Sequence, residues 1–179
     1  MKIENITGQP VIETDRFTLR PVQASDAGLI TLYAGDERVA RMTTSIPHPM
    51  PPGAADAFVE RTQATDRSED VWVIDCSPSG GSQMVGLIGM ERMDRDQSEV
   101  GYWIAPAFWN SGIASEAVSA IIKANPQQAG VIFASVFQDN PASARVLTNC
   151  GFAYLGDAES FSVARDANVR TWTYSLKLG

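Results

Sequence analysis

A short polar loop between an aromatic stretch and an apolar one is where residue types and spacing point to chemistry. Asn110, Ser111 and Gly112 form this loop. The preceding run, Glu99 to Ala105, is aromatic and β-branched, which predicts a strand. From Ile113 the apolar residues recur at helical spacing. A helix start presents unpaired N–H groups and the positive end of its dipole, so the loop can bind an anion such as phosphate; an ordinary strand-to-helix corner is the alternative.

Glu99 is the candidate general base. On a regularly pleated strand its side chain shares a face with Gly101 and Trp103, so it points into whatever cleft that face lines. A carboxylate there can take a proton from an ammonium group, directly or through water, and burial would raise its pKa toward that task. A solvated glutamate at a strand end is the alternative reading. Glu116, beyond the loop, is a rival base.

Length and composition predict one domain over residues 1–179, with residues 1–10 as a loose lead-in, because 179 residues at 44% hydrophobic content suffice for a single core. The net charge of −7 and scattered basic residues speak against nucleic acid and favour cationic partners. One histidine and two cysteines offer no metal-ligand cluster. No apolar stretch has membrane-spanning length and no signal peptide is evident, so we expect a cytoplasmic protein.

Patterning predicts a fold of the α/β type. We expect strands at 17–22, 71–76, 84–93, 99–105, 131–137, from 154 onward and at 170–178, and helices after Ser25, at 54–65, from Ile113 and from Pro141. The proline-rich stretch 45–53 must be a loop. The run 131–137 is almost continuously apolar, as expected of a strand buried on both faces in a parallel pairing.

The loop resembles a known cofactor motif. F-W-N-S-G-I-A-S-E-A is similar to the coenzyme-A loop of the GNAT superfamily of N-acetyltransferases, Gln/Arg-x-x-Gly-x-Gly/Ala, with Trp109, Gly112 and Ala114 on its fixed positions. Trp109 is the variant of the Rim-type branch, which acetylates ribosomal-protein N-termini and typically reads W-G-x-G-Y-A-T-E-A. The chain departs at Asn110 and Ile113. Asparagine tolerates positive φ, so the loop shape can survive.

A second motif supports the same resemblance. The family segment V-x-x-x-N-x-x-S-x-x-V-L-x-x-x-G-F is matched at Val136, Asn140, Ser143, Val146, Leu147, Gly151 and Phe152. V-I-E-T-D-R-F-T-L-R-P also resembles the opening strand of the Rim-type branch. The likeness covers almost the whole chain from Val11, although Thr171 stands where that branch often has aspartate.

The resemblance implies the GNAT-like acyl-CoA N-acyltransferase fold: a mixed, mostly antiparallel sheet that splays between the strands at 99–105 and 131–137, flanked by helices. It also implies acetyl-CoA as co-substrate and no metal. Trp109 would act partly as a lid on the cofactor loop. The pyrophosphate would bind the backbone amides of Asn110, Ser111, Gly112, Ile113, Ala114 and Ser115.

The resemblance assigns the remaining cofactor contacts as well. The backbone of Trp103 and Ile104 would pair with the pantetheine. Asn140 would hydrogen-bond the cofactor or its loop. Ser143 would give a proton to the departing thiolate, or else simply cap a helix.

The expected activity is direct acetyl transfer to a primary amine. Whole-chain likeness to the Rim-type branch favours a protein or peptide α-amine, with the loop 45–53 as a rim of the acceptor site. A small-molecule amine acetyltransferase and a non-catalytic acyl-CoA sensor or partner module remain alternatives. A dinucleotide-binding domain is a weaker one, because no second βαβ unit is visible. We expect a monomer or homodimer with no nucleic-acid or membrane partner.

Overall fold

The computed structural model describes residues 8–178. Residues 1–7 of the expected lead-in therefore lie outside the described residues, but the end of that segment is held in place. Gln9 is buried, and its amide donates to the Val71 carbonyl at 2.8 Å. The Trp72 indole donates to the Pro10 carbonyl at 2.8 Å. The prediction of a loose lead-in is thus wrong for residues 9 and 10, because two long-range hydrogen bonds anchor them.

One mixed sheet forms the centre of the described chain. Its strands are β1 Ile12–Glu13, β2 Thr18–Pro21, β3 Glu69–Asp75, β4 Gly86–Arg92, β5 Gln97–Ile104, β6 Val131–Phe137, β7 Ala153–Ser162 and β8 Ala167–Lys177. They lie in the order β1-β2-β3-β4-β5-β6-β8-β7. Every pairing is antiparallel except that of β5 with β6. The predicted mixed, mostly antiparallel sheet is confirmed.

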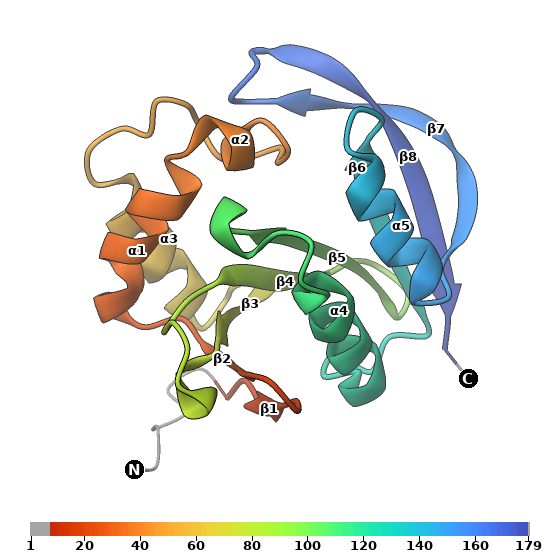
Figure 1. Cartoon of the computed structure of the whole chain (residues 1–179). Helices are drawn as coiled ribbons and strands as arrows, with labels where there is room; N and C mark the ends of the chain where they lie inside the picture. The colour runs from red at the N-terminus through yellow and green to blue at the C-terminus, as the bar shows by residue number, and fades with distance from the viewer. Residues whose placement is uncertain (1–7, 179) are drawn as a thin grey trace.

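Helices cover both faces of the sheet (Figure 1). They are α1 Ala27–Ala34, α2 Glu37–Ala40, α3 Ala54–Gln63, α4 Ile113–Ala124 and α5 Pro141–Asn149, with short 3₁₀ turns at Ala24–Asp26, Ser77–Ser79 and Pro106–Phe108. Two cores follow from this layering. One lies between α4, α5 and the sheet and includes Ile88, Ile121 and Leu147; the other lies under α1 and α3 and includes Val59 and Val73. The side chains of each strand alternate between them.

The sheet splays between β5 and β6. Only three residue pairs join these strands: Gln97 with Val131, Ser98 with Ile132 and Glu99 with Phe133. Beyond Glu99, β5 has a partner on its β4 side alone. This confirms the expected splay and leaves one edge of β5 open over most of its length.

Strand β6 corrects one prediction. Its bounds are those expected, but it pairs antiparallel with β8 over seven residues and parallel with β5 over only three. Ile132 and Ala134 are buried, whereas Ser135 is exposed to the opening of the splay. Burial on both faces of a parallel strand is therefore wrong, because the splay removes the neighbour that would have covered one side.

Candidate functional site

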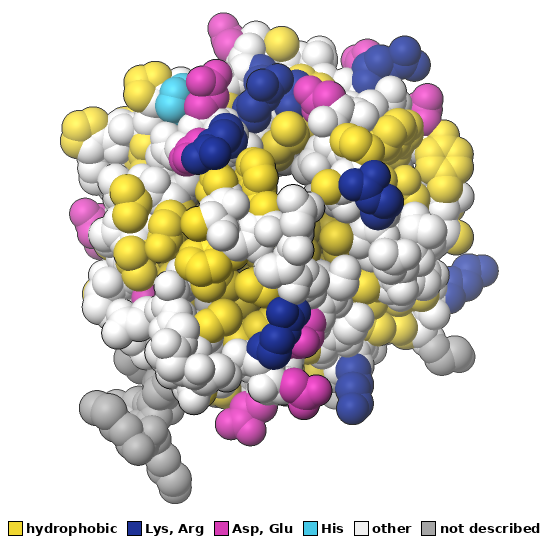
Figure 2. Space-filling model, viewed as in Figure 1, with side chains coloured by type: hydrophobic (Ala, Val, Ile, Leu, Met, Phe, Trp, Pro, Cys, Tyr) yellow, Lys and Arg dark blue, Asp and Glu magenta, His cyan; other side chains and the backbone are white. Residues whose placement is uncertain are grey.

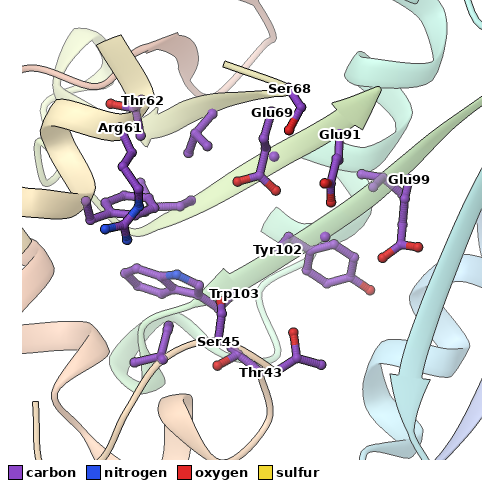
Figure 3. A pocket seen from close by; sticks show the side chains of 18 of the residues that line it. Thr43, Ser45, Arg61, Thr62, Ser68, Glu69, Glu91, Glu99, Tyr102 and Trp103 are labelled. Carbon is purple, nitrogen blue, oxygen red and sulfur yellow. The ribbon is translucent and has the colours of Figure 1, made fainter. Parts of the chain in front are cut away.

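A cleft of about 850 Å³ opens on the α1 and α3 side of the splay (Figure 3). Its floor is formed by β3, β4 and β5. Its walls come from α3, from the segment Met42–Ile46 and from the C-terminal strands. Of the predicted rim 45–53, only Ser45 and Ile46 line the cleft, and Met42, Thr43 and Thr44 precede it. The proline-rich part, with exposed His48, lies away from the opening.

Strand register orders the floor into rows. Glu69 on β3 stands opposite Glu91 on β4, and Glu91 stands opposite Glu99 on β5. One step along the same face, Gly89 stands opposite Gly101. The next step brings Leu87 opposite Trp103. The predicted shared face of Glu99, Gly101 and Trp103 agrees with the core packing, because Trp103 packs on the core under α1 and α3, whereas Val100 and Ile104 belong to the core under α4 and α5.

The carboxylates of the floor perturb one another. The pKa of Glu99 is raised from 4.5, first because the cleft walls remove water from around it and then because Glu91 lies beside it. The pKa of Glu69 is also raised, by desolvation and then by Glu91, Glu99 and Asp70, with Arg61 acting in the opposite direction. Both side chains still meet solvent through the cleft mouth. A carboxylate with a raised pKa beside an open strand edge is suited to general-base chemistry.

The anion-binding loop has the shape that its sequence predicts. Asn110 has φ of 59° and Gly112 has φ of 77°, so both lie in the left-handed region. Helix α4 begins at Ile113, and its first intrahelical bonds leave the amides of the loop and first turn free: among the described residues, none from Asn110 to Ser115 donates to a protein group. A carbon added at Gly112 would lie 3.4 Å from an Arg16 nitrogen. The loop therefore offers closely spaced donors for an anion.

Arg16 holds this loop from outside. Its guanidinium donates to the Ser111 carbonyl at 2.8 Å and to the Glu116 carboxylate at 3.1 Å. The Thr14 hydroxyl donates to the other Glu116 oxygen at 2.9 Å. Glu116 thus braces the loop and does not line the cleft, which argues against it as the base. The guanidinium of Arg16 therefore brings a positive charge to the loop that carries the free amides.

The open edge of β5 is not presented by the residues expected. The Ala105 amide donates to the Val85 carbonyl at 2.8 Å, which makes these opposed residues a hydrogen-bonded pair. Because such pairs alternate, the backbone groups of Trp103 point to β4 and those of Tyr102 point to the open edge. Ile104 also faces that edge, but its carbonyl accepts the Trp109 indole N–H at 2.7 Å. The predicted pairing of the Trp103 backbone with a cofactor stays a prediction, but it is the backbone of Tyr102, and not that of Trp103, that points to the open edge.

The start of α5 approaches β5 across the splay. Asn140 caps the helix, its side-chain oxygen accepting the Ser143 amide at 3.4 Å, and its side-chain nitrogen donates to Ser143 Oγ at 3.1 Å. The Tyr102 hydroxyl donates to the Ser143 carbonyl at 3.2 Å. Burial raises the pKa of Tyr102 to about 12. Asn140 therefore orients the Ser143 hydroxyl beside the open edge.

The predicted residues fall into two groups on opposite sides of the splay. The loop from Asn110 to Ser115 and the start of α5 lie on the α4 and α5 side, where Cys150 Sγ lies 3.6 Å from the Ser115 carbonyl, whereas the ring of Trp109 lies 6.0 Å from the guanidinium of Arg38 on α2. Glu99 lies on the cleft side. The open edge of β5 is the passage between them. The side chain of Trp109 is 45% exposed. Of the four tryptophans, only Trp72 is fully buried.

Sequence reasoning missed Glu69, Glu91, Tyr102 and Arg16. The two glutamates carry a signal: each stands near the outer end of a strand in consecutive hairpins, so the turn positions set them opposite Glu99. The sequence carries no such signal for Arg16 and Tyr102, because their hydrogen-bond partners are 95 and 41 residues away along the chain.

Among residues 8–178, no group of His, Cys, Asp and Glu is arranged to hold a metal ion. Over the same residues, no helix has the length and apolar character needed to cross a bilayer. On the face shown in Figure 2, Lys and Arg side chains are interspersed with acidic and apolar ones and form no continuous patch.

Comparisons with known proteins identify the family of the chain. A family model described as an acetyltransferase (GNAT) domain matches residues 16–153. The uncharacterized N-acetyltransferase YoaA of Bacillus subtilis is 28% identical over 180 residues, which cover 93% of this chain and 96% of YoaA.

Solved structures share the fold. The microcin C7 self immunity acetyltransferase MccE, in complex with acetyl-CoA and AMP, superposes with a TM-score of 0.79 at 16% identity, covering 92% of this chain and 94% of its own. The ribosomal-protein-S5-alanine acetyltransferase of Vibrio fischeri gives 0.75 at 21% identity, covering 94% and 96%. The family model spans most of the chain and includes the loop, both β5 and β6, and the start of α5. The chain therefore belongs to the GNAT family of acetyltransferases.

Proposed function

We propose that this enzyme transfers the acetyl group of acetyl-CoA directly to the α-amine of a protein or peptide. The observation that carries the proposal is the arrangement around β5. Free loop amides lie on one side of the splay, a cleft with Glu99 lies on the other, and an open strand edge joins them. Acetyl-CoA supplies an activated thioester, and the chain needs only to bind, orient and move protons.

The loop amides and Arg16 would hold the pyrophosphate. They combine unpaired N–H groups, the positive end of α4 and a guanidinium, all of which favour a doubly charged anion. The absence of a side chain at Gly112 lets the phosphate approach the backbone. The backbone groups of Tyr102 at the open edge would pair with the pantetheine amides as a further strand would, and an amide of the same edge would receive the thioester oxygen.

Glu99 would act as the base and Ser143 as the acid. Glu99 takes one proton from the ammonium, so the nitrogen lone pair can attack the thioester carbonyl carbon. A carbon–nitrogen bond forms, the carbon–sulfur bond breaks, and the electron pair of that bond goes to sulfur. Ser143, oriented by Asn140, gives a proton to the thiolate and recovers one from solvent. The second proton of the amine is released to solvent.

Several features support an α-amine acceptor. A ribosomal-protein-S5-alanine acetyltransferase has a similar fold, so a protein acceptor is compatible with this fold. The α-amine has an unperturbed pKa of about 7.7–8.0, against about 10.4 for lysine, so far more of it is neutral near pH 7. The cleft has a volume of about 850 Å³ and lies between a polar segment and an acidic floor.

A thiol-release assay tests the proposal. The enzyme would be incubated with acetyl-CoA and short peptides that begin with Ser, Ala or Met, with the same peptides blocked at the N-terminus, and with small monoamines. We expect transfer to free N-termini and none to blocked ones. Acetylation of small amines with no transfer to any free N-terminus would overturn the assigned acceptor. Failure of calorimetry to detect saturable acetyl-CoA binding would overturn the activity itself.

A further inference from the structure

Three carboxylates in the cleft floor lack any partner. Glu69, Glu91 and Glu99 are adjacent in the strand register, one on each of β3, β4 and β5. Their side chains project from the floor into the cleft (Figure 3). Among residues 8–178, none of the three forms an ion pair or a side-chain hydrogen bond, whereas their neighbour Asp70 pairs with Arg67 and Arg92. Like charges opposite one another destabilise a sheet, so this row is costly unless something positive binds it.

Two further features of the same cleft indicate a ligand. Thr171, on β8, is 2% exposed and lines the cleft, and its hydroxyl is buried without a hydrogen-bond partner among the described residues. Buried polar groups are almost always satisfied, so an unpaired hydroxyl in a cleft wall suits a site that a ligand completes. Beside the acidic row, Gly89 and Gly101 stand opposite each other, and the Glu69 carboxyl group lies over Gly89, its carbon 3.2 Å from where a Cβ of residue 89 would stand. Open space remains above Gly101.

We propose that the row Glu69, Glu91 and Glu99 recognises a second positive charge on the acceptor. This charge is carried by a basic side chain close to the N-terminal amine, and the amine is the group that is acetylated. The inference rests on the proposed function and specifies its acceptor. Glu99 borders the open edge of β5, where the thioester arrives, so the reacting amine lies at this end. Glu91 and Glu69 extend the negative row away from that edge and receive the second charge.

Strand geometry sets the spacing of the two charges. Neighbouring strands are about 4.8 Å apart, so Glu69 lies about 10 Å from Glu99 across the floor. An extended chain advances about 3.3 Å per residue, so Lys or Arg at the second or third position can place its charge at that distance. The nearest opposing charge is Arg61 of α3, which faces the row from the cleft wall. Arg61 offsets part of the negative charge of Glu69, so the second cation lies between Glu69 and Glu91 and contacts both carboxylates.

The test compares the ratio of kcat/KM values for matched peptides. One peptide carries Arg at the third position, and its partner carries the neutral isostere citrulline there. For the wild type we expect the Arg peptide to be preferred by about tenfold, because two partly solvated carboxylates each contribute a factor of about three to five. The preference should shrink as salt is added, since exposed charge pairs are screened. The ratio cancels any loss of folded enzyme in a variant.

The variants are Glu69→Gln with Glu91→Gln, and Glu13→Gln as the matched control. Glu13 is an exposed glutamate on β1 of the same sheet, outside the cleft. We expect the double variant to bring the ratio to about one and Glu13→Gln to leave it near the wild-type value. Glu91→Lys should go further and favour a peptide with Glu at the third position.

Each outcome decides between parts of the scheme. Free N-termini acetylated at equal rates whatever their charge would overturn the recognition row and leave the proposed function standing. A preference for the Arg peptide that stays unchanged in the double variant would also overturn the recognition row. Transfer to linear diamines of matching length, with none to any peptide, would overturn both the peptide source of the second charge and the α-amine acceptor.

Discussion

Glu99 differs from the other two carboxylates of the floor in its neighbours. It lies at the last residue pair that joins β5 to β6, where the open edge of β5 begins. Desolvation and the charge of Glu91 hold its pKa above 4.5, so its carboxylate is a stronger base than that of an exposed glutamate. Glu99 thus combines a place at the open edge of β5 with a raised basicity.

Glu99→Gln tests this role. We expect kcat to fall by about a hundredfold at pH 7, because a positioned general base contributes that order of rate. The wild-type rate should rise with pH as Glu99 loses its proton, with an inflection above 4.5, and that limb should be missing in the variant. Acetyl-CoA affinity, measured by calorimetry, should stay unchanged, because Glu99 and the loop lie on opposite sides of the splay. A variant with wild-type kcat at every pH would exclude Glu99 as the base.

For single residues, the sequence predicts which face of a strand a side chain occupies, but it does not predict which groups that residue contacts. Glu99 could be placed with Gly101 and Trp103 because strand alternation is strict. The exchange of Tyr102 for Trp103 at the open edge could not be foreseen, since it depends on which pairs of the β4–β5 ladder are hydrogen-bonded. Whether Ser143 donates a proton stays a prediction.

The loop and helix α4 act as one element. The backbone is left-handed at Asn110 and again at Gly112, and these two residues bring the amides of the first turn to one side. The residue types there made the shape predictable from sequence. By contrast, α2 is four residues long and was missed, because so short a helix leaves no periodic pattern.

Gly112→Glu tests the loop, with Gly80→Glu as its matched control. Both glycines have similar positive φ, 77° and 83°, so both changes carry the same backbone strain and the same added charge. We expect each to lower the free energy of unfolding by about 1–2 kcal/mol. Only Gly112→Glu should weaken acetyl-CoA binding, by at least about tenfold, because it places a carboxylate where the phosphates bind. Equal affinities in the two variants, measured by calorimetry, would remove the loop from the cofactor site.

At the scale of the whole molecule, a buried ionic cluster ties β2 and the chain that enters α1 to β3. Arg20 on β2 is 7% exposed and pairs with Asp26 at 2.8 Å and with Asp75 on β3 at 2.8 Å. Its hydrogen bonds hold the chain entering α1 against the strands that form the cleft floor. Nothing in the sequence marked these residues, because ion pairs between distant positions leave no local pattern.

Arg20→Met should lower the free energy of unfolding by about 3–5 kcal/mol, because it leaves two buried carboxylates without their cationic partner. Arg38→Met is the control, since Arg38 pairs with Asp36 at 2.7 Å while 65% exposed. Loss of that surface pair should cost less than about 1 kcal/mol. Denaturant unfolding of both variants measures the difference. Equal stabilities would show that the buried cluster contributes nothing beyond a surface pair.

The three residue pairs that join β5 to β6 have a mechanical consequence. They are the only ladder between the part of the sheet that carries the cleft floor and the part that carries β6, β8 and β7. A small rotation about this narrow connection changes the width of the gap while breaking few hydrogen bonds. Any molecule that fills the gap best at one width therefore favours one angle between the two parts. Cofactor occupancy and acceptor affinity are then linked through that angle, and by reciprocity each changes the other by the same factor.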